Sequence, residues 1–229
     1  MAHLAVAASS AADVPVSINS DMPAGGGTLG LDVLLNHVVV IDYPRTTFCI
    51  LAPGDVSTAL RRNATWTHAT LRAGKLFVDT TIAGETRRDL FFDTGSSRFP
   101  IIVEHALWSA MTGWTQPSDT AATVNTTQWG KPKSYIGAHA KQTVRIAGVT
   151  LDAPVVFYEE DGFYRDNFGA AGLLGNAPFW NSVVILDLTP RLRFGTLPPV
   201  AASRAEKQRF IGGSFETTLV RTPHARPPV

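Results

Sequence analysis

An acid, a hydroxyl and a glycine follow one short apolar run, and they form the strongest candidate for a catalytic group. The segment at residues 90–97 reads LFFDTGSS. Gly95 permits a sharp turn that brings backbone N–H groups close to the Asp93 carboxylate. The hydroxyls of Thr94 and Ser96 can donate hydrogen bonds that stabilise its charged form. The pattern predicts either a carboxylate held for acid–base chemistry or a simple Asx-type turn that closes a strand.

Two segments of the chain repeat each other. Residues 27–42 align with residues 172–187 at a constant offset, 172 − 27 = 145. The identical pairs include Gly30/Gly175, Asn36/Asn181, Val38/Val183, Val39/Val184 and Asp42/Asp187, followed after one inserted residue by Arg45/Arg191 and Phe48/Phe194. A repeat of this period indicates two copies of one lobe. It assigns the counterpart of Asp93 to position 93 − 145 = −52, ahead of the first residue.

Together, the motif and the repeat resemble the aspartic proteases of the pepsin and retroviral-protease type. In that family each lobe has an apolar strand ending in Asp-Thr-Gly, further strands, and then two apolar residues and a glycine before a short helix. Residues 90–97 match the first part, and Gly172-Leu-Leu-Gly175 matches the last. The resemblance therefore predicts that Asp93 lies in a loop beside residues 172–175. Lys75–Gly84 resembles the lead-in hairpin. The resemblance covers residues 70–197 as one whole lobe and residues 27–51 as the end of another.

The resemblance implies a role for each residue of the motif. Asp93 would be a catalytic carboxylate, and Ser96 would be its outer hydrogen-bond partner. Thr94 would be the hydroxyl that locks two Asp loops together, next to the motif glycine Gly95. The implied reaction is hydrolysis of a polypeptide substrate by a water held between two Asp. Tyr135, in the segment SYIG, is a candidate flap tyrosine that binds substrate over the cleft. The alternative for Tyr135 is a loop aromatic that packs locally.

The sequence departs from the family in one respect that bears on activity. The chemistry needs two carboxylates that share one proton, one acting as base and the other as acid, but Asp-Thr-Gly occurs once here. We therefore expect an aspartic-type endopeptidase that is incomplete unless a missing first lobe or a homodimer supplies a second Asp-Thr-Gly. The alternative is a non-catalytic pepsin-like binding module in which Asp93 is a buried, hydrogen-bonded acid. Asp79-Thr-Thr lacks the glycine, and Asp42 and Asp187 at strand ends are interpreted as structural.

Strand-forming segments outnumber helical ones along the chain. The expected fold is mainly β, and the resemblance implies an acid-protease β-barrel lobe with one or two short helices. The best helical segment is residues 103–111, while residues 1–26 and 113–134 have the composition of loops. The predicted organisation is a first-lobe remnant at 1–52, a linker at 53–69, a complete lobe at 70–197, and a poorly ordered tail at 198–229 with one expected strand at 215–220.

Composition and charge exclude several classes of function. The 229 residues include 20 Lys+Arg and 19 Asp+Glu, so a net charge of +1 gives no electrostatic basis for binding nucleic acid or an anionic membrane. No apolar run reaches the roughly 18 residues that a membrane span needs. Cys49 is the one cysteine, which excludes an internal disulfide and a multi-cysteine metal site.

Neither a cofactor nor a metal is predicted. The six histidines show no metal-ligand spacing, and no G-x-S-x-G motif accompanies them. Residues 25–30 match G-x-G-x-x-G, but no strand precedes them, and the repeat explains Gly27 and Gly30 better than a dinucleotide site does. The N-terminal segment has no Lys or Arg ahead of its small apolar residues, so it is no clear secretory signal. The compartment stays open; only the resemblance suggests a secreted or periplasmic location.

Overall fold

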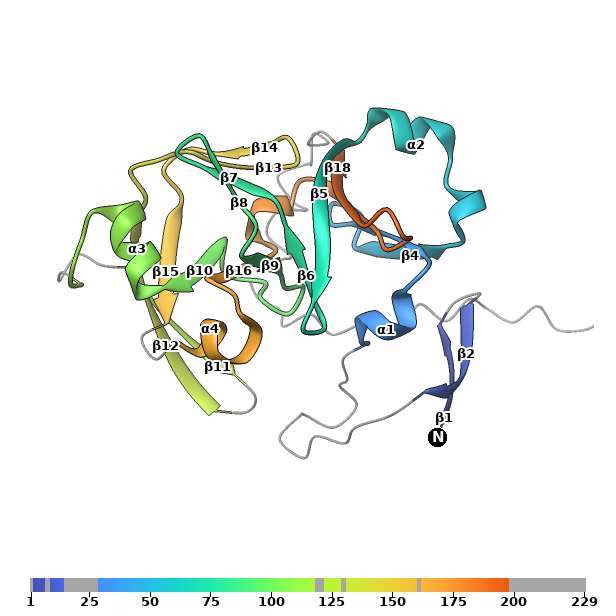
Figure 1. Ribbon diagram of the computed structural model, residues 1–229, viewed down its shortest axis with the longest axis horizontal. Helices are drawn as coiled ribbons and strands as arrows, with labels where there is room; N and C mark the ends of the chain where they lie inside the picture. The colour runs from blue at the N-terminus through green and yellow to red at the C-terminus, as the bar shows by residue number, and fades with distance from the viewer. Residues whose placement is uncertain are drawn as a thin grey trace, which may run out of the picture.

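The structure is a computed structural model, and it describes residues 2–6, 9–14, 29–117, 122–128, 131–159 and 162–197. The glycine cluster at 25–27 and the predicted tail at 198–229, with its expected strand at 215–220, lie outside the described residues. Within those residues the fold is mainly β, as predicted (Figure 1).

The strands have the following bounds: β1 (Ala2–Val6), β2 (Ser9–Val14), β3 (Val38–Asp42), β4 (Thr47–Leu51), β5 (Thr65–Arg72), β6 (Lys75–Val78), β7 (Thr80–Ile82), β8 (Glu85–Arg87), β9 (Leu90–Phe92), β10 (Ile101–Glu104), β11 (Ala122–Gln128), β12 (Lys131–His139), β13 (Val144–Ile146), β14 (Val149–Leu151), β15 (Val155–Glu159), β16 (Gly172–Leu174), β17 (Val183–Asp187) and β18 (Arg193–Leu197). The helices are short: α1 (Leu31–Leu34), α2 (Thr58–Asn63), α3 (His105–Thr112), α4 (Phe163–Phe168), and the 3₁₀ turns η1 (Pro53–Asp55) and η2 (Ala177–Phe179).

One large mixed sheet runs through the molecule. Its strand order is β11-β12-β15-β10-β16-β9-β6-β5-β18-β17-β3-β4, and a second sheet has the order β14-β13-β7-β8. The pairs β10–β15 and β9–β16 are parallel, and the other pairs are antiparallel. The expected closed barrel does not form among the described strands, because β5 carries the sheet onward instead of closing it. The first half of β5 pairs with β18, and its second half pairs with β6.

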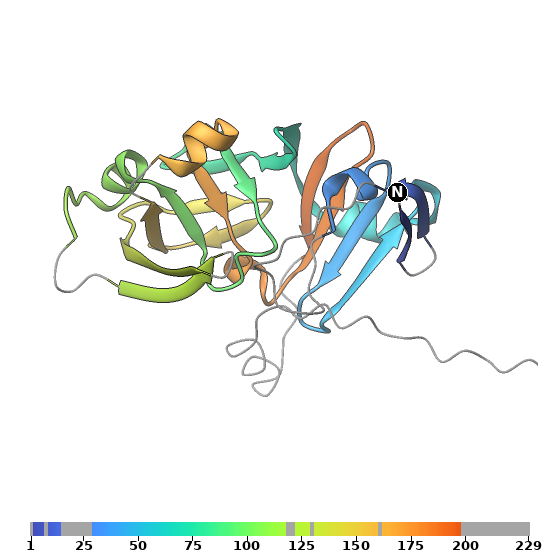
Figure 2. The same ribbon diagram turned by 90° about the horizontal axis from the view of Figure 1, so that it is seen from below.

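The internal repeat builds the centre of this sheet. Strand β17 pairs antiparallel with β3, and Val40 lies opposite Ile185. Each of these strands also forms a hairpin with the strand that follows it, β3 with β4 and β17 with β18 (Figure 2). Val40 faces Cys49 in one hairpin, and Ile185 faces Gly195 in the other. The offset is therefore 145 in the first strands and 146 in the second, which confirms the inserted residue predicted from the sequence.

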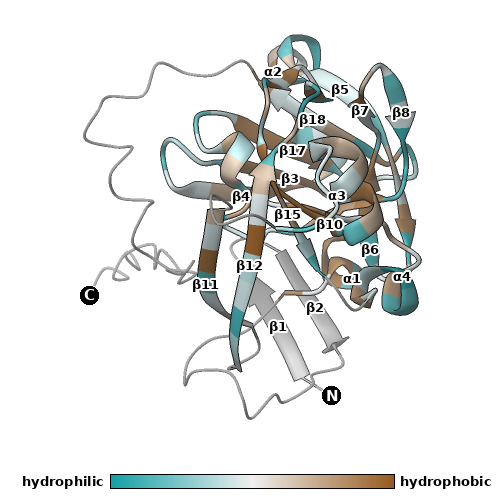
Figure 3. Cartoon of the chain, turned by 90° about the vertical axis from the view of Figure 1, so that its left-hand side faces the viewer, coloured by the Kyte–Doolittle hydropathy of each residue, from teal (hydrophilic) through white to brown (hydrophobic). Residues whose placement is uncertain are grey.

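Apolar side chains fill the interior on both sides of the large sheet. In Figure 3 the hydrophobic colouring gathers on inner strands such as β10 and β15. Helix α3 covers β10 and β15, and it begins two residues later than predicted because Val103 and Glu104 belong to β10. Trp108 of this helix is fully buried, as expected of a core residue, and its indole N–H donates to the Val156 carbonyl at 2.9 Å. The helix ends at Gly113, whose φ of 77° is left-handed, as a C-terminal cap favours.

Three segments predicted to be irregular contain regular structure. Residues 2–6 and 9–14 form a separate two-stranded sheet, in which the two strands pair antiparallel and Val6 lies opposite Ser9. The Thr-rich stretch at 113–134 contains β11 and the start of β12, which pair along their length. Thr and Val favour strands even where one face is exposed. The predicted linker holds η1, helix α2 and the first half of β5, and Ser57 caps α2.

Candidate functional site

Strand β9 places Asp93 at the edge of an aromatic cluster. All three residues of β9 are buried, and their side chains alternate between the two sides of the sheet. Phe92 packs in the main core, whereas Phe91 packs in a cluster with Phe99, Tyr135 and Tyr164 among others. Because Asp93 follows two residues after Phe91, it continues on the side of the sheet that carries this cluster.

The loop that carries Asp93 lies beside β16, as the sequence predicts. The Asp93 N–H donates to the Leu174 carbonyl at 2.9 Å, extending the parallel pairing of β9 with β16. On its other side, β16 pairs antiparallel with β10. Gly175 is required here, because a Cβ on it would lie 2.1 Å from the Phe99 carbonyl oxygen and 2.4 Å from that of Ser96. The prediction that residues 172–175 adjoin the Asp93 loop is confirmed.

The Asp93 carboxylate is held by the backbone of its own turn. Its Oδ1 accepts a hydrogen bond from the Gly95 N–H at 2.9 Å, and the Ser96 N–H donates to the Asp93 carbonyl at 3.2 Å. This bond from Ser96 joins the two main chains, and the role of the Ser96 hydroxyl as outer hydrogen-bond partner of the carboxylate stays a prediction. Thr94 and Gly95 are exposed at the tip of the loop, and Asp93 is half-buried. A water molecule can therefore reach the carboxylate.

Asn176 holds this loop from its buried side, and its role was not predicted from the sequence. Its side chain is completely buried, and its Nδ2 donates to the Thr94 carbonyl at 2.5 Å. Its backbone N–H donates to the Ser96 carbonyl at 2.9 Å. The hydroxyl of Tyr43 donates to its Oδ1 at 2.5 Å. Tyr43 lies between β3 and β4 in the first repeat, and burial raises the pKa of its phenol. The available signal was an amide placed directly after the Gly172–Gly175 motif.

Two tyrosines of the aromatic cluster, Tyr135 and Tyr164, interact with each other. Tyr135 is buried in strand β12, not in a loop, and its ring contacts Phe99 at a centroid distance of 4.9 Å. Its hydroxyl is hydrogen-bonded to that of Tyr164. Burial raises the pKa of Tyr164, and the neighbouring Tyr135, Glu159 and Asp93 raise it further. Local packing of Tyr135 is thus present, and its role in binding substrate stays a prediction.

The other acids that the sequence singled out form ion pairs. Asp187 accepts from the Thr189 hydroxyl and the Arg193 guanidinium, each at 2.6 Å. Burial alone would raise the pKa of Asp187, but these hydrogen bonds outweigh it and lower the pKa below its ordinary value. Asp42 pairs with Arg45 at 2.6 Å. Asp79 pairs with Arg88 at 3.3 Å, in the turn between β6 and β7.

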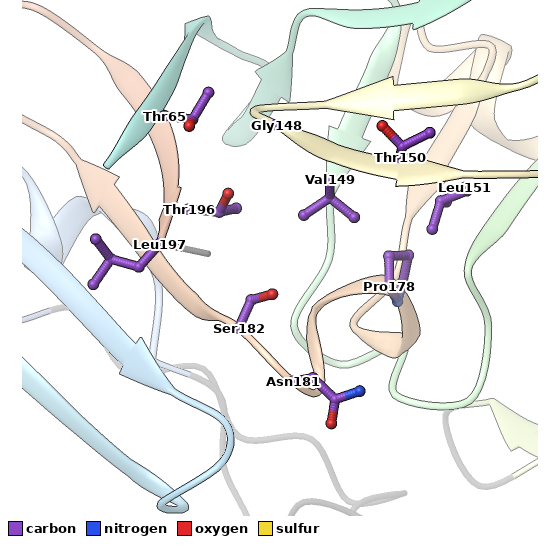
Figure 4. A pocket seen from close by; sticks show the side chains of 10 residues that line it. All are labelled: Thr65, Gly148, Val149, Thr150, Leu151, Pro178, Asn181, Ser182, Thr196 and Leu197. Carbon is purple, nitrogen blue, oxygen red and sulfur yellow. The ribbon is translucent and has the colours of Figure 1, made fainter. Parts of the chain in front are cut away.

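A pocket of about 330 Å³ lies elsewhere in the molecule (Figure 4). Its wall is formed by the β13–β14 turn, strand β18 and the residues around η2, and it includes the hydroxyls of Thr65, Thr150, Ser182 and Thr196. None of its lining residues belongs to the Asp93 loop. The described residues contain no group of three or more side chains that could hold a metal ion. No helix in the described ranges is both long and apolar enough to cross a membrane.

Comparison with known proteins gives remote matches. No family model and no curated protein matches this chain. Among solved structures, the chain is similar to basic 7S globulin from soybean, with a TM-score of 0.35, 12% sequence identity and coverage of 72% of this chain. It is also similar to conglutin gamma, a basic 7S globulin from lupine seeds, with a TM-score of 0.37, 11% identity and coverage of 76% of this chain. The match spans about half of each globulin chain, 52% and 53% respectively.

Proposed function

We propose that this chain supplies one half of an aspartic-type endopeptidase site of the pepsin and retroviral-protease type. Asp93 would be one of its two catalytic carboxylates. The observation that carries the proposal is the junction of β9, Asp-Thr-Gly and β16, in which the Asp93 N–H donates to the Leu174 carbonyl. This junction holds one half-buried carboxylate just before the exposed tip of a hydrogen-bonded loop.

The chemistry assigns complementary tasks to two carboxylates. The ionised one takes a proton from the attacking water, while the protonated one donates to the carbonyl oxygen of the scissile peptide and later to the leaving nitrogen. Two neighbouring carboxylates share one proton because two like charges at short range disfavour full ionisation. A lone Asp93 can act as the base, but it cannot supply the acid. Turnover therefore requires a second Asp-Thr-Gly loop.

The exposed tip of the Asp93 loop supports such an arrangement. Thr94 and Gly95 face outward, so a second loop can approach the carboxylate. Asn176 fixes the same loop from its buried side through the Thr94 and Ser96 carbonyls. The loop is thereby held in place before a partner arrives, which is the condition for effective electrostatic catalysis.

An acid casein assay on a dilution series of this chain and of Asp93→Asn tests the proposal. We expect negligible turnover from the monomer. Any turnover at high concentration should fall with the square of chain concentration, respond to a statine inhibitor and disappear in Asp93→Asn. First-order turnover that depends on Asp93 would contradict the need for a second loop. Turnover that survives Asp93→Asn would remove Asp93 from the mechanism.

The alternative function is a non-catalytic binding module with a pepsin-like lobe. Two observations favour it: Asp-Thr-Gly occurs once in the sequence, and the Gly95 N–H already satisfies Oδ1 of Asp93 as an ordinary turn would. In that case polypeptide binding should be equal for the wild-type chain and Asp93→Asn. Isothermal titration with a casein peptide and, separately, with a statine inhibitor separates the two functions. An aspartic protease site loses affinity for the inhibitor when Asp93 is replaced, whereas a binding module binds the casein peptide equally well with and without Asp93.

A further inference from the structure

The large sheet ends on strand β4, whose outer edge is unpaired within the described residues. Strand β4 pairs with β3 alone, and it is the last strand in the order of the sheet. Phe48 on this strand is the exposed large hydrophobic residue of the described chain, with 40% of its surface open. Cys49, next to it, is also exposed. An open edge with an apolar side chain is a template for pairing with another strand.

The second repeat shows what covers the equivalent edge. Strand β18 is the counterpart of β4, and its outer edge pairs antiparallel with β5. Phe194, the counterpart of Phe48, is completely buried there. Its ring lies 5.1 Å from that of Phe92, at the end of the strand that leads to Asp93, and 5.4 Å from that of Phe179. Within the described residues, the outer edge of β18 is therefore covered, whereas the outer edge of its counterpart β4 is open.

The pairing of Val40 with Ile185 relates the two edges by a local two-fold axis. From this relationship we propose that the outer edge of β4 binds one antiparallel strand of a second polypeptide, which carries counterparts of β5 and β9. The strand would pair with the main chain of Thr47–Leu51, and an apolar side chain of the β9 counterpart would cover Phe48. Docking is independent of catalysis; only the Asp-Thr-Gly at the end of the β9 counterpart rests on the proposed function.

The register of β5 against β18 specifies which residues of the partner strand would lie opposite β4. Residue 66 of β5 lies opposite Gly195, whose counterpart on β4 is Cys49. A Cβ on Gly195 would lie 2.7 Å from the Trp66 ring, so a large side chain fits there only over glycine. Because β4 has a cysteine at this position, the partner strand needs a small residue opposite it. Main-chain pairing supplies the affinity in such strand additions, and alternate side chains supply the specificity.

Disulfide trapping at Cys49 of the full chain tests both the site and the register. The probe is a synthetic peptide of residues 65–72 with Trp66→Cys, activated as a thionitrobenzoate mixed disulfide. The Cys49 thiolate displaces thionitrobenzoate, whose release gives the rate. The matched control peptide carries Thr67→Cys instead, which points to the opposite face. We expect the Trp66→Cys peptide to react at least about fivefold faster, because pairing raises the effective concentration of its sulfur.

Each outcome of this experiment supports or overturns the proposal. Trapping that favours the Trp66→Cys peptide and is absent in Cys49→Ser supports it. Less than about a fivefold preference between the peptides overturns the register and with it the docking site. Faster oxidation of Cys49 to a disulfide between two copies of the chain identifies a second copy as occupant and overturns it as well. Selective trapping in a chain that fails every peptidase test leaves the docking site standing and removes the proposed function.

Discussion

Val40 lies directly opposite Ile185 in the central sheet, and the two residues are also counterparts at the repeat offset of 145. In an antiparallel pair, a residue that faces its own counterpart marks a local two-fold axis. The strands that pack around the hairpin β17–β18 therefore indicate which strands could pack around its counterpart, β3–β4. Under the proposed function, a second Asp-Thr-Gly would lie across this axis from Asp93.

Replacing Asn176 should loosen the Asp93 loop and destabilise the fold. Asn176→Ala removes its hydrogen bonds to the Tyr43 hydroxyl and the Thr94 carbonyl, and we expect a loss of about 2–4 kcal/mol in the free energy of unfolding. Urea denaturation measures it. Asn167→Ala is the control, because Asn167 is exposed in α4, and it should change stability by less than about 0.5 kcal/mol. Equal effects of the two substitutions would contradict the anchoring role of Asn176.

A methyl group at Gly175 should displace the Asp93 loop. Gly175→Ala places a Cβ 2.1 Å from the Phe99 carbonyl oxygen, which must move, and we expect a cost of about 3 kcal/mol from overpacking. Thermal unfolding monitored by circular dichroism gives the result. Gly54→Ala serves as the matched control, since no atom lies within 4 Å of its Cβ. A variant at position 175 as stable as the one at position 54 would refute the close approach.

Asp187 should make stability fall in acid. Its pKa in the folded chain lies below the ordinary 3.8, so its ion pair stabilises the fold above that pH, and the stabilisation is lost as the pH falls through the lowered pKa. We expect Asp187→Asn to cost about 3 kcal/mol at pH 7. This cost should shrink as the pH is lowered below 3.8. Urea midpoints measured across that range decide the matter, with exposed Asp55→Asn as control. A cost that is independent of pH would exclude the ion pair as the cause.

The position of Asp93 could be predicted because its signals are local. An apolar strand, a turn-forming glycine and the motif at Gly172–Gly175 each occupy a few consecutive residues. The hairpin alignment followed in the same way from identities at a constant offset. Helix α3 could also be predicted from its local sequence. It begins two residues later than expected because β-branched Val103 belongs to strand β10.

The features that escaped prediction depend on contacts between distant residues. Asn176 meets Tyr43 across a separation of 133 residues, and neither residue type indicates the other. Strand β5 pairs with both β18 and β6, and this leaves the sheet open. Its pairing with β18 joins residues that lie far apart in the sequence. Tyr135 was assigned to a loop because the Thr-rich segment before it has the composition of a turn, whereas cross-strand pairing makes it a hairpin.

A two-lobed chimera provides the most direct measurement of the central claim, that Asp93 works only with a second Asp-Thr-Gly across the axis. Residue 27 is the counterpart of residue 172, so joining a copy of residues 65–171 directly to residue 27 of this chain builds two lobes in register. The copy carries Trp66→Ala, because this position lies opposite Cys49 and needs a small side chain there. We expect the chimera to cleave casein at acidic pH and the unextended chain at equal concentration to remain at background.

Two further results are expected of the chimera. A statine inhibitor should block the activity, and Asp93→Asn in the original lobe, or the same change in its copy, should each lower it at least about a thousandfold. A chimera that unfolds in one cooperative transition yet cleaves no faster than the single chain would contradict the account.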